Sequence, residues 1–437
     1  MDQLTPSFAA LLEAFRPCFR EEVFCVFRLM TAAWVVCLGR RTISRVWQTT
    51  GRAATHCHCP AYRLFSEAAW NADEVGRILL VKLLFAFVPG SRVFLVIDDT
   101  LCHKRGAKVA FGGIFLDAVL SSKRHKVFRF GNNWVTLGLV VQLPFRPDRF
   151  FCLNVLWRVA AKKAKAKAAQ HKTKPQLARE MVELAASWLP GRRLVVLADR
   201  AYVGKALLKG LPEGVAAIGP IHKKAALTEP LPEGYKGRRK IGDALTTPAE
   251  AFDDDGRWAW QDVLLRHPKG EKGLQVKLIG PCCWYASAGQ MPLNVVLVRD
   301  PEGGWRDEAL LCGALDLSAE EVVLGYLRRW SVEVAYCESK QMLGFHDPKV
   351  YSERAVSRAH PMAWFVGALV VLWYAEVGLQ EPQAHSHRPW YKDKVSPTFA
   401  DMLSCLRLHL WTNWLENGPG GREEKLAWLL EYLATAA

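Results

Sequence analysis

The sequence predicts an α/β protein: a mixed sheet with flanking helices, interrupted by a β-rich insertion, with helical N- and C-terminal regions. Three observations lead to this prediction. Short apolar runs at 92–97 and 193–198 are typical of buried strands, and each is followed by aspartate. Residues 250–315 alternate in strand fashion, with Gly and Pro between the strands. Both ends of the chain instead have apolar residues at helical spacing.

Composition and charge restrict the class of protein. The chain has 437 residues, which suits two or three domains, and its net charge of +15 favours a polyanionic partner, nucleic acid before membrane. No basic segment followed by an apolar run opens the sequence. The longest apolar run, 361–375, is shorter than the roughly 20 residues that span a membrane, so we expect a buried helix. We therefore expect a cytoplasmic protein without a membrane partner.

Residues 1–88 are predicted to form a helical region that binds DNA. Small helical units with basic edges commonly bind DNA, whereas a helical cap on the next domain would show the same pattern. The predicted helices are 8–15, 22–38, 61–70 and 73–87, and the basic stretch contains Arg40, Arg41, Arg45 and Arg52.

Residues 89–219 are expected to form the first part of the sheet. The strand at 92–97 ends in Asp98-Asp99-Thr100, and the strand at 193–198 ends in Asp199-Arg200-Ala201-Tyr202. Side chains at the carboxyl ends of such strands lie where open α/β sheets bind ligands. The other elements predicted here are three meander strands at 127–130, 134–143 and 150–157, a helix at 175–189 and a strand at 214–218.

Three segments follow this part of the sheet. Residues 220–315 are predicted to be the β-rich insertion, which begins with a basic loop and continues as a small antiparallel unit. Residues 316–350 return to the core through one helix, for which Ser318 is a suitable N-cap, and 351–437 are helical. The predicted strands are 258–265, 274–285, 292–298 and 308–313, and the C-terminal helices are 352–378, 398–416 and 423–436.

The core helix has an unusual polar face. Tyr326, Arg329, Glu333 and Lys340 lie at steps of three, four and seven, so on one helix they would fall within roughly one-sixth of a turn. A solvated helix with salt bridges would show the same residues. The helix is predicted to pack on the core through an apolar stripe formed by Val323, Leu327, Trp330, Val334 and Cys337.

Three carboxylates would meet if this helix lay over the strand ends: Asp98, Asp199 and Glu333. Without Cys or His partners they suit hard cations such as Mg²⁺ or Mn²⁺ rather than zinc. Two such ions can clamp a phosphodiester, one activating water or a 3′-hydroxyl and the other stabilising the leaving oxygen. Strand, meander, helix and strand with Asp, Asp and a helical Glu is the ribonuclease H-like arrangement.

These motifs resemble those of a known family. The chain is similar to DDE transposases of bacterial insertion sequences, in the group marked by a Tyr-x2-Arg-x3-Glu-x6-Lys signature. Residues 326–340 have that spacing, and Asp98-Asp99-Thr100 and Asp199-Arg200-Ala201-Tyr202 stand where the group has Asp-x-Thr and Asp-Arg-x-Tyr/Phe. The resemblance covers roughly residues 60–350.

The resemblance implies roles for these residues. Asp98, Asp199 and Glu333 would be the catalytic residues and would bind two Mg²⁺ or Mn²⁺ ions. Arg329 and Lys340 would hold phosphates near the cleaved end, and the remaining signature residue, Tyr326, would contact DNA there.

Further DNA contacts are expected outside the signature. Trp305 and Trp284, both in the insertion, are candidates for stacking on a flipped base, although core packing would explain either. Arg200, Lys104 and Arg105 are candidates for backbone contacts, with a solvated loop as the alternative for the last two. The lysine-rich segment 162–174 and the loop 220–245 would add salt-sensitive, nonspecific affinity.

Two assignments stay open at this point. Neighbouring residues of an extended strand point to opposite sides, so either Asp98 or Asp99 faces the site, and the Asp-x-Thr spacing favours Asp98. Glu338 is the alternative to Glu333, but lies about 140° away on the helical wheel.

The implied function is cut-and-paste transposition by a bacterial, nucleoid-associated protein. The expected partners are double-stranded DNA, both terminal inverted repeats and target, and a second copy of the chain in a synaptic homodimer. A domesticated, non-catalytic DNA-binding protein and a general nuclease of the same fold remain alternatives.

Overall fold

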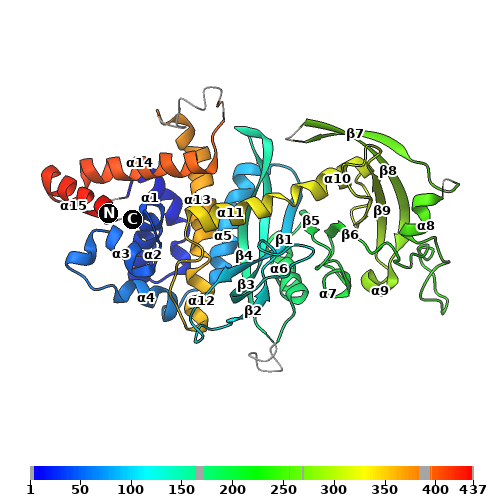
Figure 1. The fold of residues 1–437 in the computed structure, drawn as a ribbon, viewed down its shortest axis with the longest axis horizontal. Helices are drawn as coiled ribbons and strands as arrows, with labels where there is room; N and C mark the ends of the chain where they lie inside the picture. Colours follow the sequence, from blue (N-terminus) through cyan, green and yellow to red (C-terminus); the bar gives the residue numbers. More distant parts are fainter. Residues whose placement is uncertain are drawn as a thin grey trace.

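The protein is built along one sheet, with helices gathered at one end and the insertion at the other (Figure 1). The structure is a computed structural model of the chain, and it describes residues 4–162, 171–254, 256–267, 270–382, 394 and 396–435. Most of the lysine-rich segment 162–174 therefore lies outside the described residues.

Ten strands of the described residues form this sheet, in the order β2-β3-β1-β5-β6-β10-β9-β8-β7, while β4 pairs with β3. β1, β5 and β6 are parallel, and the other neighbours are antiparallel. The predicted mixed sheet with flanking helices is confirmed and is consistent with a ribonuclease H-like fold. The strands are β1 (Arg92–His103), β2 (Gly113–Leu116), β3 (Phe128–Leu143), β4 (Arg146–Ala160), β5 (Arg193–Ala198), β6 (Val215–Pro220), β7 (Gln261–His267), β8 (Gly270–Cys283), β9 (Pro292–Arg299) and β10 (Glu308–Cys312).

The helices lie in three groups along the chain, and several begin at the expected kind of residue. Ser318 caps α10 as predicted, because its side chain accepts a hydrogen bond from the Glu321 N–H. The N-terminal helices are α1 (Pro6–Glu13), α2 (Glu21–Val36), α3 (Ile43–Thr49), α4 (Cys59–Ser66) and α5 (Ala72–Phe87). The central helices are α6 (Lys174–Trp188), α7 (Lys205–Leu208), α8 (Pro248–Asp253), α9 (Tyr285–Ala288), α10 (Ala319–Arg328) and α11 (Ser331–Met342). The C-terminal helices are α12 (Glu353–Ala359), α13 (Met362–Glu376), α14 (Phe399–Asn417) and α15 (Arg422–Ala434).

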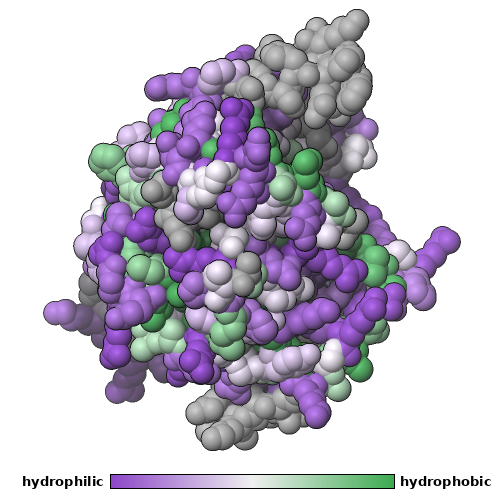
Figure 2. All heavy atoms as spheres, turned by 90° about the vertical axis from the view of Figure 1, so that its left-hand side faces the viewer, coloured by the Kyte–Doolittle hydropathy of each residue, from purple (hydrophilic) through white to green (hydrophobic). Residues whose placement is uncertain are grey.

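Helices from both ends of the chain pack into one helical end around α13. Phe365 of α13 lies against Phe15 and Phe27, with ring centroids 5.1 and 5.5 Å away. The stretch 353–376 is long and apolar enough to cross a membrane, but 83% of its most apolar window is buried inside the protein. This apolar stretch is therefore buried in the core, as expected from the length of the apolar run. Hydrophilic residues cover most of the outer face of this end (Figure 2).

Several predicted strands differ from the structure. β1 does not end at residue 97 but continues to His103, because its last residues go on pairing with β3. The predicted strands at 127–130 and 134–143 are one strand, β3, in which the buried amide of Asn132 donates to the Ala110 carbonyl. The strands at 258–313 pair antiparallel as predicted, and they continue the core sheet because β10 pairs with β6. β2, α3, α8 and α9 have no counterpart among the predicted elements.

One hydrogen bond fixes α11 over the centre of the sheet. The Tyr336 hydroxyl of α11 lies 2.6 Å from the Thr136 hydroxyl of β3, and both side chains are buried. Thr136 is the register partner of Asp98 in β1. The helix is therefore held next to the position that Asp98 occupies in β1.

Replacing Tyr336 with Phe should lower the free energy of unfolding by about 1–3 kcal/mol, because the buried Thr136 hydroxyl loses its partner. Denaturant or thermal unfolding measures this change. Tyr285→Phe is the matched control, since its side chain is 41% exposed and should change stability little. Equal effects of the two substitutions would show that the bond does not hold α11 in place.

Candidate active site

The parallel pair β1 and β5 brings two aspartates side by side. Their pairing ends at Ile97 and Ala198, so Asp98 and Asp199 are the next residues on the two strands. Neighbouring strands lie about 4.8 Å apart, and residues in register point to the same face. Asp98 and Asp199 therefore leave the sheet together, on the face covered by α10 and α11.

Asp98 and Asp99 occupy opposite faces of β1 and have different partners. Asp99 accepts hydrogen bonds from the Lys174 ammonium at 2.6 Å and from the Tyr202 hydroxyl at 2.8 Å. Asp98 instead lies 2.8 Å from the Arg329 guanidinium. The geometry therefore favours Asp98 as the residue that faces the candidate site, while Asp99 is held in an ion pair behind the sheet.

The signature stretch is not one helix, which corrects the sequence prediction. α10 ends at Arg328 and α11 begins at Ser331. Between them the Arg329 N–H donates to the Tyr326 carbonyl and the Glu333 N–H donates to the Trp330 carbonyl, which is the tighter three-residue spacing. This turn interrupts the regular helical spacing between the two halves of the signature.

The predicted apolar stripe is also wrong for α11. Trp330 is 66% exposed and Cys337 is exposed, whereas Val332, Tyr336 and Ser339 are buried. The turn at 329–330 changes which side of the second helix faces the sheet, and a single helical wheel across the turn does not apply. Glu333 is consequently exposed on the face that carries the signature.

Arg329 is the centre of the site. Its guanidinium donates to Asp98 at 2.8 Å, and both side chains are largely buried. It also interacts electrostatically with Asp199, Glu333 and Tyr326, whose ring centroid lies 5.7 Å from the guanidinium carbon. The structure thus brings together five of the predicted residues: one cation, one phenol and three carboxylates.

Burial and charge shift the ionisation of this cluster. Burial, helped by the carboxylates of Glu333 and Asp99 and opposed by Arg329, raises the pKa of Asp98 to about 7. Burial lowers the pKa of Arg329, but Asp98 and the other carboxylates outweigh it and raise that pKa above its ordinary value. The guanidinium therefore stays charged, and Asp98 is the carboxyl that titrates near neutral pH.

Glu338, the alternative to Glu333, is occupied elsewhere. Its carboxylate lies 3.1 Å from Arg149 of β4, and both side chains are mostly buried. Glu333 has no such partner among the described residues and faces the cluster around Arg329. The geometry favours Glu333.

The other predicted DNA contacts lie in different settings. Lys340 is half-buried two turns after Glu333, and burial lowers its pKa. Lys104 donates to the carbonyls of His346 and Pro348, so its ammonium is held by the backbone. Arg200 forms an exposed ion pair with Glu308 at 2.5 Å. Among the described residues none of these three cations forms an ion pair with Asp98, Asp199 or Glu333, although Lys340 interacts electrostatically with Glu333.

The two tryptophans of the insertion differ in their surroundings. Trp305 is half-buried in the turn between β9 and β10, and its backbone N–H donates to Asp300. Trp284 packs against the hydrophobic cluster of the insertion. Neither is as exposed as Trp330, which lies directly beside Arg329 and which sequence reasoning assigned to the core.

A comparison with known families identifies the chain. The profile of a family described as DDE superfamily endonuclease matches residues 14–270, more than half of the sequence. The chain belongs to the DDE superfamily endonucleases. The matched part of the endonuclease contains Asp98 and Asp199 and ends before the 326–340 signature, so the roles of Arg329 and Glu333 rest on their geometry. Among curated proteins, none matches the sequence.

Family membership implies a divalent metal and a DNA substrate, and the residues present suit that metal in their chemistry. Asp98, Asp199 and Glu333 offer only carboxylate oxygens, the ligands that Mg²⁺ and Mn²⁺ prefer. No three His, Cys, Asp or Glu side chains in the described part of the chain lie close enough together to bind one ion. In this conformation Arg329 compensates the charge of the carboxylates instead.

The raised pKa of Asp98 predicts a pH dependence of stability in the metal-free endonuclease. Between its ordinary pKa of 3.8 and about 7, Asp98 is protonated in the folded state but ionised in the unfolded chain. The folded state therefore binds more protons, and the free energy of unfolding falls as the pH rises through this window, by at most about 1.4 kcal/mol per pH unit.

Asp98→Asn should remove this contribution, so the difference in unfolding free energy between variant and wild type should shift in the variant's favour from pH 4 to pH 7. Denaturant unfolding at a series of pH values in EDTA measures it. The substitution also alters the contact with Arg329. A change in unfolding free energy from this cause that does not depend on pH has no effect on the comparison, because only the slopes against pH are compared. Parallel curves would contradict the shifted pKa.

Proposed function

We propose that this endonuclease is a transposase, which cleaves DNA at transposon ends and joins the freed 3′-hydroxyl to target DNA. One observation carries the proposal: two signatures far apart in the sequence meet in space. Asp98 and Asp199 from the parallel strands and Glu333 from α11 surround Arg329. Insertion-sequence transposases resemble this chain in the same residue types and spacing.

In the proposed reaction Asp98, Asp199 and Glu333 hold two Mg²⁺ or Mn²⁺ ions. Bound there, the ions would activate the attacking hydroxyl and stabilise the leaving oxygen. Arg329 exchanges its contact with Asp98 for the phosphate beside the cleaved bond, to which a guanidinium can donate two parallel hydrogen bonds. Lys340 neutralises a phosphate farther along the same strand.

Aromatic side chains would contact the DNA near the cleaved end. Tyr326 lies half-buried against Arg329, and the exposed ring of Trp330 offers a flat surface on which a base can stack. Trp305 and Arg200 are proposed to contact DNA from the insertion side. A homodimer that pairs two inverted-repeat ends would complete the complex, in the nucleoid of a bacterial cell.

Glu333→Gln should retain DNA binding but lower Mg²⁺-dependent cleavage of a transposon-end duplex by about a thousandfold or more, since several kcal/mol of metal-assisted stabilisation is lost. Gel analysis of a labelled duplex measures cleavage, and anisotropy measures binding. Glu338→Gln is the matched control on the same helix and should keep cleavage, because Glu338 pairs with Arg149. Full activity of Glu333→Gln would end this assignment. Equal cleavage of scrambled ends would indicate a general nuclease, and binding without any cleavage a non-catalytic protein.

Arg329→Ala should tighten Mn²⁺ binding to the DNA-free protein by roughly tenfold or more, because a cation next to the carboxylates is removed. The same substitution should weaken DNA cleavage, because a phosphate donor is lost. Calorimetry of Mn²⁺ binding measures the first effect. Arg149→Ala is the control, since Arg149 pairs with Glu338 and should leave Mn²⁺ affinity unchanged. Unchanged or weaker Mn²⁺ binding in Arg329→Ala would show that Arg329 does not compete with the ion.

A further inference from the structure

Two neighbouring hollows lie where α11 meets the helical end of the molecule. One of about 540 Å³ lies between the loop after α2, the end of β1 and the loop after α11. The other, of about 790 Å³, lies between the loop after α2, the end of α11 and α14. Both are lined by Arg40 and Asp347, so the two hollows adjoin there, and together they are here called the basic groove.

The basic groove is lined by many cations and one carboxylate. Arg40, Arg105 and Lys349 are exposed, and Lys340 is half-buried. Within the described parts of the chain, none of these four side chains has a hydrogen bond or ion pair. Many arginines elsewhere on the surface are paired with carboxylates, as Arg77 is with Glu74. The groove therefore keeps positive charge that the fold neutralises at many other places.

Three more cations are fixed in the groove without being neutralised. The Arg41 and Arg407 Nε atoms donate to the carbonyls of Trp34 and Val35, at 3.0 and 2.8 Å. Lys104 likewise donates to two backbone carbonyls. A carbonyl oxygen satisfies a donor but carries no net charge, so these contacts hold the cations in place and leave their field intact.

The only carboxylate in the lining is turned toward the backbone. Asp347 accepts a hydrogen bond from the Arg41 N–H at 2.8 Å. This bond ties the loop after α11 to the loop after α2. The Asp347 carboxylate offsets part of the charge of Arg41 and Lys104, but it is one anion among seven cations. A strongly positive groove of this kind fits a polyanion.

The groove is continuous with the candidate active site through α11. Lys340 lines the groove, and its ammonium interacts electrostatically with the Glu333 carboxylate. Seven residues of helix separate the two, which is about 10 Å, or about three nucleotides at 3.4 Å each. A strand held at the carboxylates would thus reach the groove within a few nucleotides.

We propose that the basic groove binds the phosphate backbone of the DNA duplex that extends from the cleaved bond toward the helical end. This inference rests on the proposed function, because it takes the cluster around Arg329 as the place of cleavage. Arg40, Arg105, Lys340 and Lys349 contact phosphates, while Arg41, Lys104 and Arg407 shape the groove. The contacts are to phosphates and therefore do not depend on base sequence.

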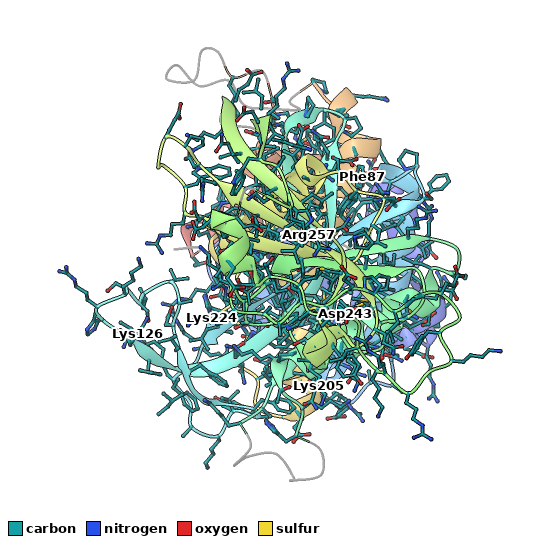
Figure 3. All side chains as sticks on the ribbon, turned by 90° about the vertical axis from the view of Figure 1, so that its right-hand side faces the viewer. Phe87, Lys126, Lys205, Lys224, Asp243 and Arg257 are labelled. Carbon is teal, nitrogen blue, oxygen red and sulfur yellow. The ribbon has the colours of Figure 1, made fainter. Side chains whose placement is uncertain are left out.

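The test neutralises the three exposed groove cations together, as Arg40→Ser, Arg105→Ser and Lys349→Ser. These side chains have no partner to lose in the described parts of the chain, so folding should be preserved. The control removes three exposed lysines outside the groove, as Lys126→Ser, Lys205→Ser and Lys209→Ser. Lys126 and Lys205 are labelled in Figure 3, which views the opposite end of the molecule. Both variants lose the same total charge.

Anisotropy in EDTA would measure binding of each protein to a duplex of about 30 base pairs with no end sequence, over a range of salt concentrations. Loss of three phosphate contacts should make the slope of log Kobs against log salt shallower by about three in the groove variant, and by much less in the control. Equal slopes in the two variants would overturn the groove.

Cleavage by the wild-type protein is scored separately. If the wild-type protein cleaves transposon ends but the groove and control variants have equal salt slopes, the groove proposal is wrong and the proposed function stands. A shallower slope in the groove variant, with no cleavage by the wild type, would support the groove and overturn the function.

Discussion

The contact between Arg329 and Asp98 is the interaction on which the organisation of the site depends. Two aspartates at the ends of parallel strands and a glutamate on a nearby helix repel one another, and burial makes ionisation of Asp98 more costly still. A buried guanidinium among them offsets that cost without a metal. The same position is where a divalent cation would be needed. In the proposed reaction this internal cation would leave Asp98 for a DNA phosphate.

The surrounding fold places Arg329 and Asp98 so that they can make this contact. β1 and β5 end their pairing immediately before the two aspartates, and the bond between Tyr336 and Thr136 keeps α11 above them. The turn between α10 and α11 directs Arg329 into the sheet and leaves Glu333 and Trp330 exposed. Ion pairs behind the sheet and with Arg149 engage Asp99 and Glu338. Asp99 and Glu338 are thus each paired with a cation outside the cluster around Arg329.

The sequence predicted the fold class and the residues that gather around Arg329. Apolar runs and strand-end aspartates can be recognised from neighbouring residues alone. The signature can be recognised by its spacing in the sequence, even though a tight turn divides it between two helices. The turn itself was not predictable, because Trp330 and Ser331 are compatible with an uninterrupted helix, and so the buried face of α11 was assigned wrongly. The partners of Asp99 and Glu338 lie far away in the sequence, at Lys174 and Arg149, and only the folded chain brings them together. The groove likewise joins arginines and lysines from four separate segments.

The most direct test of this account is to locate Mn²⁺ in crystals of the protein by its anomalous scattering. We predict Mn²⁺ bound by Asp98 together with Asp199 or Glu333, with the Arg329 guanidinium moved away from Asp98. Crystals in which Arg329 still contacts Asp98 and Mn²⁺ is absent from these carboxylates, or bound elsewhere, would contradict it.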